Sequence, residues 1–176
     1  MSPDLFTEDI IYVIDTSALI NLENIFKYDN PVFKAVWEEI ESLIVKDNLI
    51  TLDFVEEEID SYEGNKEFLK EWFKKCKKKK KFVKTTDEAV INEAIPIINQ
   101  EYNTGFLNKN KLASGKDEAD PYLIAYCKIN SFVLITDESK FKPNKMPAVA
   151  NKNGVKTINL SEFFEARGLR MVRKNE

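Results

Sequence analysis

Histidine is absent from this chain of 176 residues, and its absence excludes several kinds of active site. A Ser-His-Asp triad, a Cys-His pair, a histidine general base and a zinc ion bound by histidine are all unavailable. Hydrolysis by this chain would therefore have to rely on carboxylates and a hard cation.

Cysteine is scarce as well. The two thiols, Cys76 and Cys127, indicate a reduced protein rather than a disulfide scaffold. Lysines flank Cys76 and would lower the pKa of its thiol, which favours reaction with oxidants. We prefer the alternative interpretation, an unreactive thiol at the surface.

Long apolar segments are missing too. No run approaches the roughly 20 apolar residues that span a bilayer, and residues 1–9 lack the basic and apolar parts of a signal peptide. We therefore expect a cytoplasmic protein with no membrane partner. With 43% hydrophobic residues, the length suits one domain over residues 1–176 with a single core.

Positive charge is concentrated in one segment. Thirty acidic residues outnumber 26 basic ones, and the formal charge of −4 argues against a generally basic surface for nucleic acid. Residues 74–84 nevertheless hold eight lysines and no acid, so a strong local field is expected there. This run could grip phosphates or be a solvated, frayed helix end. The candidate phosphate-binding residues are Lys77, Lys78, Lys79, Lys80 and Lys81, with Arg167, Arg170 and Arg173 as a second choice.

Short apolar runs alternate with helical patterns along the chain. We expect strands at residues 11–14, 49–52, 132–136 and 155–158. We expect helices at residues 18–26, 32–46, 53–62, 65–81, 87–102 and 121–129, and a last one from Ser161. The alternation predicts an α/β fold, a three-layer α/β/α sandwich around a central, mainly parallel sheet of about four to five strands. Its core covers about residues 11–166, with a helical insertion at about 64–112.

Two expected strands end on a carboxylate beside a hydroxyl. Asp15 ends the run YVI and is followed by Thr16 and Ser17, with Ser17 a plausible N-cap for the next helix. Thr136 and Asp137 follow the run VLI in the same way. Because ligands of open α/β sheets bind outside the carboxyl ends of the strands, these acids lie where a site is expected.

Helical geometry selects among the acids that follow the strand at 49–52. Taking 100° per residue, Glu58 lies roughly 65° from the buried direction of the helix, Glu56 roughly 95° and Glu57 on about the opposite face. Glu58 is the better candidate and Glu57 a second choice. Glu56 has its own explanation, a capping box with Asp53 as the N-cap.

A fourth acid begins the helix at 121–129. Asp120 before Pro121 reads as an N-cap, but the same position also brings it to the edge that holds Asp15 and Asp137. Asp117 is a second choice. Several carboxylates so close together repel one another unless a cation neutralises them, so the cluster is a candidate cation site.

The same segments resemble the PIN domain family of metal-dependent nucleases. The resemblance rests on VIDTSALINL at 13–22, VEEEI at 55–59, DPYLIAYC at 120–127, VLITDESKF at 133–141 and the terminal GVKTINLSEFF at 154–164. It implies a PIN-like fold with acidic site positions at Asp15, Glu58, Asp120 and Asp137. The implied supporting hydroxyls are Thr16, Ser17 and Thr136.

The resemblance also implies an activity. A PIN-like protein would hydrolyse RNA phosphodiester bonds with Mg²⁺ or Mn²⁺, with Asp15, Asp137 and Asp120 as ligands. Glu58 would be a ligand or would position the attacking water. Many members are dimeric toxins paired with a small antitoxin. The resemblance therefore implies a homodimer and an antitoxin partner for this chain. The longer middle of this chain looks closer to a PIN-like group described mainly as a domain of unknown function.

Two other functions compete with the nuclease. A catalytically silent PIN-like module would bind RNA or protein without turnover. A phosphatase or phosphotransferase would use Asp15 as a nucleophile, but its common signature needs a second Asp where Ser17 stands.

Overall fold

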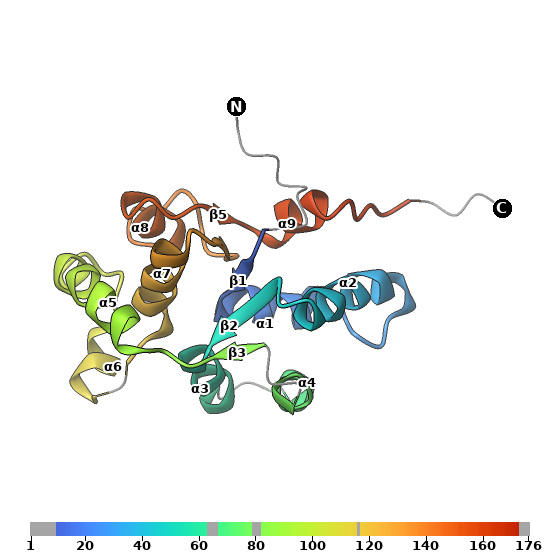
Figure 1. Ribbon diagram of the computed structural model, residues 1–176, viewed down its shortest axis with the longest axis horizontal. Coiled ribbons are helices and arrows are strands. Elements are labelled where there is room, and N and C mark those ends of the chain that lie inside the picture. Colours follow the sequence, from blue (N-terminus) through green and yellow to red (C-terminus); the bar gives the residue numbers. More distant parts are fainter. Residues whose placement is uncertain (1–9, 63–66, 79–81, 116, 173–176) are drawn as a thin grey trace.

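A five-stranded parallel sheet forms the centre of the protein. The computed structural model describes residues 10–62, 67–78, 82–115 and 117–172 (Figure 1). The strands are β1 (Tyr12–Ile14), β2 (Leu49–Leu52), β3 (Val83–Lys84), β4 (Val133–Ile135) and β5 (Thr157–Ile158). They lie in the order β3-β2-β1-β4-β5, and each neighbouring pair is parallel.

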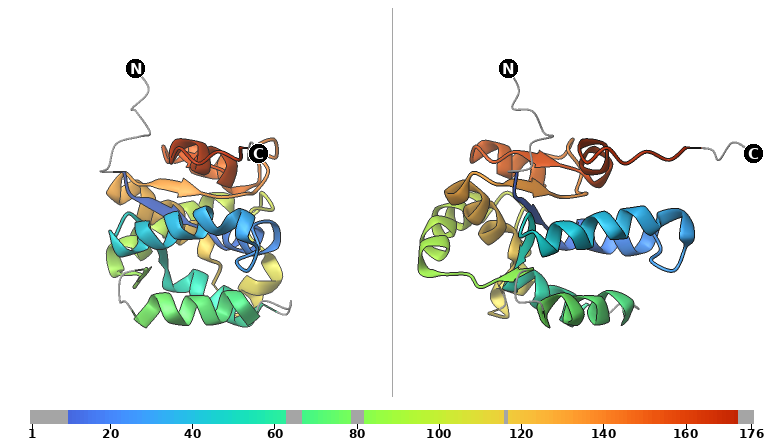
Figure 2. Two further views of the ribbon diagram at one scale, coloured as in Figure 1. Left: turned by 90° about the vertical axis from the view of Figure 1, so that its right-hand side faces the viewer. Right: turned by 45° about the vertical axis from the view of Figure 1, so that its right-hand side comes forward.

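Helices cover both faces of this sheet. They are α1 (Thr16–Ile25), α2 (Lys34–Val45), α3 (Asp53–Ser61), α4 (Glu67–Lys78), α5 (Glu88–Glu101), α6 (Lys109–Ala113), α7 (Ala119–Asn130), α8 (Met146–Lys152) and α9 (Leu160–Ala166), with a short 3-10 turn at Pro31–Phe33. Figures 1 and 2 show α1, α2, α4 and α9 on one face and α5, α7 and α8 on the other. The predicted α/β sandwich is confirmed.

The central strands are apolar throughout because helices pack on both of their faces. Each residue of β1 and β4 is buried. The ring of Tyr12 meets that of Phe163 on α9 edge to face, with centroids 5.1 Å apart. The strand cores therefore leave no exposed side for a site, and function falls to the residues at the strand ends.

The strand order creates a switch point between β1 and β4. From β1 the chain moves outward to β2 and β3, then returns to the other side of β1 to form β4 and β5. Tyr12, Val13 and Ile14 pair with Val133, Leu134 and Ile135. In an open α/β sheet, ligands bind outside the carboxyl ends of the strands at such a switch point. The residues just after Ile14 and Ile135 therefore occupy the favoured place.

Three short elements were not expected from the sequence. Strand β3 pairs only Val83 and Lys84 with β2, and helices α6 and α8 lie in segments outside the ranges given above for expected helices and strands. Elements of this length hold too few residues to express a period of 2 or 3.6. Asn108 caps α6 by accepting from the amide of Asn110 at 3.0 Å. Such caps and long-range contacts, rather than periodicity, define them.

Some local expectations were wrong. Helix α3 begins at Asp53 as expected, but its N-cap is Leu52, and the carboxylate of Asp53 accepts from the amide and hydroxyl of Thr86. Val32, the first residue of the helix expected at 32–46, lies instead in the 3-10 turn before α2 and is 67% exposed. Cys76 is buried, not at the surface, because it lies one turn after Trp72 on the packed face of α4.

No helix in the described ranges is long and apolar enough to cross a membrane.

Truncation of Leu134 should destabilise the protein strongly. Leu134 is fully buried in β4, and a Leu134→Ala cavity costs about 2–5 kcal/mol of unfolding free energy. Ile129→Ala, at a side chain 47% exposed near the end of α7, is the matched control and should change it by less than about 0.5 kcal/mol. Urea unfolding followed by circular dichroism measures both, and equal losses would contradict the assigned packing.

Candidate active site

Asp15 stands at the end of β1 and begins α1. Its side chain accepts a hydrogen bond from the amide of Ala18 at 2.7 Å, so Asp15, not Ser17, is the N-cap of this helix. The residue is only 2% exposed. The hydrogen-bond donors around Asp15 favour its ionised carboxylate, but burial disfavours that form more strongly.

Ser17 links the two strand ends. Its hydroxyl donates to the carboxylate of Asp15, with both oxygens 2.9 Å away, and accepts from the amide of Asp137 at 3.2 Å. The hydroxyl of Thr136 lies 3.4 Å from that of Ser17. These hydroxyl and amide groups hold the ends of β1 and β4 in a fixed relation.

Asp137 is engaged on both carboxylate oxygens. One accepts from the amide of Leu160, the first residue of α9, at 2.9 Å. The other accepts from the side-chain amide of Asn21 on α1 at 3.1 Å. Asp137 therefore ties two helices to β4, which is a structural role as well as a place at the expected edge.

Glu58 reaches the site from α3. It accepts from the hydroxyl of Thr16, from the amide of Ala119 at 3.3 Å and from the ammonium of Lys111 at 3.4 Å. Its neighbour Glu57 is exposed, as expected for the opposite face of the helix. The supporting hydroxyl of Thr16 thus serves Glu58, whereas that of Ser17 serves Asp15.

Asp120 lies in the first turn of α7. The N-cap is Glu118, so Asp120 is the second residue of the helix rather than its cap. Among the described residues, no hydrogen-bond donor contacts its carboxylate. Nearby Asp117, the second choice, is exposed and accepts from the hydroxyl of Tyr122 at 3.2 Å. Asp120, rather than Asp117, is the predicted acid of this segment that lies beside Asp15 and Glu58.

Electrostatics shows which acids are neighbours. Burial raises the pKa of Asp15 to about 7, although hydrogen bonds from Thr136, Ala18 and Ser17 act in the opposite direction. Desolvation and then the charges of Asp15, Glu58, Glu138 and Glu118 raise the pKa of Asp120 well above its ordinary value. These acids therefore share one region in which negative charge accumulates and a positive counter-charge is favoured.

Glu138 was missed by the sequence reasoning. It follows Asp137 directly, and its charge raises the pKa of both Asp15 and Asp120. Its carboxylate accepts from the amide of Met146 at 2.8 Å and from Lys145 at 3.2 Å. The only sequence signal was adjacency to Asp137, which is also typical of an ordinary turn.

Most of the basic residues expected to grip phosphate fall outside the described structure. Lys79, Lys80 and Lys81 lie outside the described residues, as do Arg173 and the side chains of Lys77 and Lys78. Arg167 is not free for a substrate because its guanidinium donates to Glu39 at 2.7 Å.

The carboxylate oxygens of these acids suit a hard cation, but the described side chains do not form a complete set of ligands for one. Within the described ranges, no three carboxylate or thiol side chains stand close enough to hold a metal ion. The available donors are carboxylate oxygens, which Mg²⁺ and Mn²⁺ prefer. Desolvation and like charge disfavour ionisation of Asp15 and Asp120, so a cation would stabilise the ionised form of both.

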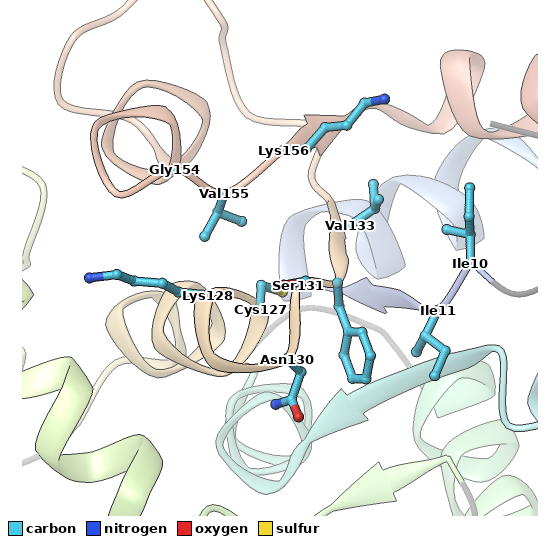
Figure 3. Close-up of a pocket in the computed structure, with 11 residues that line it drawn as sticks. Ile10, Ile11, Cys127, Lys128, Asn130, Ser131, Val133, Gly154, Val155 and Lys156 are labelled. Atoms are coloured by element: carbon cyan, nitrogen blue, oxygen red, sulfur yellow. The ribbon is translucent and has the colours of Figure 1, made fainter. Parts of the chain in front are cut away.

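A separate hollow lies at the amino ends of the strands, opposite the ends that carry the acids. It has a volume of about 450 Å³ and is lined in part by residues just before β1, β4 and β5, including Ile11, Phe132 and Val155. Figure 3 shows Cys127 at this end of α7. Burial raises the pKa of the Cys127 thiol, so it is a poor nucleophile. This hollow is distinct from the acidic site.

The raised pKa of Asp15 predicts a pH dependence of stability. Between pH 4 and 7 the folded protein keeps a proton that the unfolded chain, with an ordinary value of 3.8, has lost. Asp15 should therefore lower the unfolding free energy as pH rises through this window, by at most about 1.4 kcal/mol per pH unit, and Asp120, whose pKa is also raised, should act in the same direction. Asp15→Asn keeps a good N-cap and should make the profile less steep. Urea titrations in EDTA from pH 4.5 to 8 test this, and parallel profiles would contradict it.

Comparisons with known proteins agree with the fold. A search of curated proteins finds no match. Among solved structures, the FitAB complex bound to an IR36 DNA fragment is similar, with 18% identity, a TM-score of 0.50, and coverage of 85% of this chain and 94% of that chain. At this identity the likeness shows a shared fold alone.

Two further structures have lower scores. FitAcB from Neisseria gonorrhoeae has 17% identity and a TM-score of 0.46 and covers 85% of this chain and 97% of its own. PAE2754 from Pyrobaculum aerophilum has 14% identity and a TM-score of 0.49 and covers 91% of this chain and 98% of its own. The family model for the domain of unknown function DUF4411 matches residues 12–171, and the chain therefore belongs to this family.

Proposed function

We propose that this protein is an endoribonuclease that hydrolyses RNA phosphodiester bonds with Mg²⁺ or Mn²⁺. The observation that carries the proposal is the pair of buried Asp15 and partly buried Asp120, acids from separate elements whose pKa values are both raised. Perturbed carboxylates at the switch point of an α/β sheet are characteristic of a functional site. The PIN-like fold and the motifs that follow its strands support this reaction over other metal-dependent ones.

Asp15, Asp120 and Asp137 would hold the cation, with Glu58 either as a further ligand or as the group that positions the attacking water. When bound, such an ion supplies Lewis acidity that activates water and offsets charge on the phosphate. The side chains of the cluster must move closer together for this, since they are not closed around an ion.

The hydroxyl residues orient the acids. Ser17 and Ala18 fix the carboxylate of Asp15 through donors at 2.9 Å and 2.7 Å. Thr16 and the amide of Ala119 do the same for Glu58. These contacts restrict the rotamers of both acids, so less conformational entropy is lost when a substrate binds.

A catalytically silent module is the second candidate. The open arrangement of the carboxylates and the occupation of both Asp137 oxygens favour it. Such a module would bind RNA or protein without metal-dependent turnover. The phosphotransferase alternative is weaker because the hydroxyl of Ser17 holds Asp15, which is buried and poorly placed to attack a phosphate.

A small antitoxin and a homodimer remain proposals that rest on the resemblance to PIN toxins. A small reading frame beside the gene would support the antitoxin, and a lone gene would weaken it.

Cleavage of labelled single-stranded RNA tests the nuclease. The wild type with Mn²⁺ or Mg²⁺ should give products with 5′-phosphate and 3′-hydroxyl ends, and EDTA should abolish the reaction. Asp120→Asn and Glu58→Gln should lower the rate by at least about 100-fold, since even outer partners of a metal contribute 10- to 100-fold. Glu57→Gln is the matched control and should retain activity because Glu57 is exposed.

The product ends separate the candidates. A 2′,3′-cyclic phosphate would contradict attack by water. Absence of cleavage across varied RNAs and DNAs, with RNA binding retained, would favour the silent module.

RNA binding in EDTA tests the lysine run. Replacement of the five lysines at 77–81 by glutamine should weaken binding and reduce the slope of log affinity against log salt. The reduction should be about 0.7 for each phosphate that the lysines no longer neutralise. Fluorescence anisotropy over a salt series measures this. An unchanged slope would indicate that the lysine run is solvated and does not contact the RNA phosphates.

A further inference from the structure

Lys111 brings a positive charge from α6 into the acidic site. Its ammonium lies 3.4 Å from one carboxylate oxygen of Glu58 and 3.6 Å from one of Glu118. The lysine side chain is 43% exposed, whereas those of Glu58 and Glu118 are 18% and 13% exposed. The cation therefore sits at the mouth of the cluster, between two acids that are mostly covered.

Local structure holds Lys111 in this position. Asn108 is the N-cap of α6, and its backbone amide donates to the second carboxylate oxygen of Glu118 at 2.7 Å. The hydroxyl of Ser114 donates to the carbonyl of Lys111 at 2.7 Å at the other end of the helix. Glu118 thus contacts both the start of α6 and the ammonium that α6 presents. The approach of Lys111 follows from the fold of this segment.

A metal ion and Lys111 would compete for the same oxygen. Mg²⁺ requires a ligand oxygen at about 2.1 Å, and the ammonium already contacts the Glu58 oxygen that the amide of Ala119 also contacts. A divalent ion bound there would lie within a few ångströms of the ammonium and repel it. Both cations compensate the same negative charge.

We infer that Lys111 acts as a built-in counter-cation. Its ammonium pairs with the carboxylate of Glu58 and must move away from that carboxylate when a divalent ion binds there. The inference rests on the proposed function, since it assumes a cation site at these acids. A hollow of about 290 Å³ lies beside the lysine and is lined in part by Phe54, Ser61 and Gly115. It offers space for the displaced side chain. Lys111 is thus a positioning residue that sets the metal affinity.

Titration calorimetry with Mn²⁺, without RNA, tests the inference. Lys111→Met keeps most of the length of the side chain but removes the competing charge, so Mn²⁺ should bind about fivefold more tightly than to the wild type. Lys111→Arg keeps the charge and should bind as the wild type does. Lys109→Met is the matched control on the same helix, because Lys109 contacts Asn103 and the ring of Tyr102 instead of the acids.

Thermal melts accompany the calorimetry and show that each variant folds. In EDTA, Lys111→Met should melt below Lys109→Met because its acids lose their counter-charge, and saturating Mn²⁺ should remove that difference. Mn²⁺ binding by the wild type with unchanged or weaker binding by Lys111→Met overturns the inference alone. Binding by Lys111→Met but not by the wild type supports it. Binding by neither protein contradicts the metal site itself, and the inference with it.

Discussion

The register between β1 and β4 is the constraint on which the site depends. Ile14 pairs with Ile135, and the amide of Asp15 donates to the carbonyl of Ile135 at 3.1 Å. This pairing brings Asp15 beside Thr136 and Asp137, which come more than a hundred residues later in the chain. A slip by one residue would turn the side chains of a strand to the opposite face and separate the two strand ends. Burial of both strands between helices is what makes such a slip costly.

The acids of the candidate site also stabilise the fold, and this structural role conflicts with their burial. Asp15 caps α1 but is buried so deeply that its pKa rises to about 7. Asp137 joins α1 and α9 to β4 through Asn21 and Leu160. A neutral cap would avoid this conflict, since buried charge is costly without a partner. Retaining several such acids at one edge is understandable if a cation is their partner.

Compensation by Lys111 fits this electrostatic situation. The carboxylates of Glu58 and Glu118 receive some counter-charge from it. Among the described residues, no hydrogen-bond donor contacts Asp120, so its charge is the least compensated of the cluster. The acids therefore differ in their readiness to accept a new ligand. Asp15 and Glu58 are held in place by donors, whereas no hydrogen bond from a described residue restrains the side chain of Asp120.

The sequence by itself determined the layered α/β fold, because runs such as YVI and LITL and the periodic helices carry strong local signals. It also placed Asp15 and Asp137 at one edge, since parallel strands end together. Tertiary structure alone decided the rest. The charge of Glu138 acts on Asp15 and Asp120, which are distant in the sequence. Lys111 stands 53 positions from Glu58 on a helix too short to show a period. For the same reason, the N-caps of α1, α3 and α7 differ from those expected from the sequence. A cap depends on which nearby polar groups are engaged elsewhere, as Asp53 is by Thr86, and no local pattern records that.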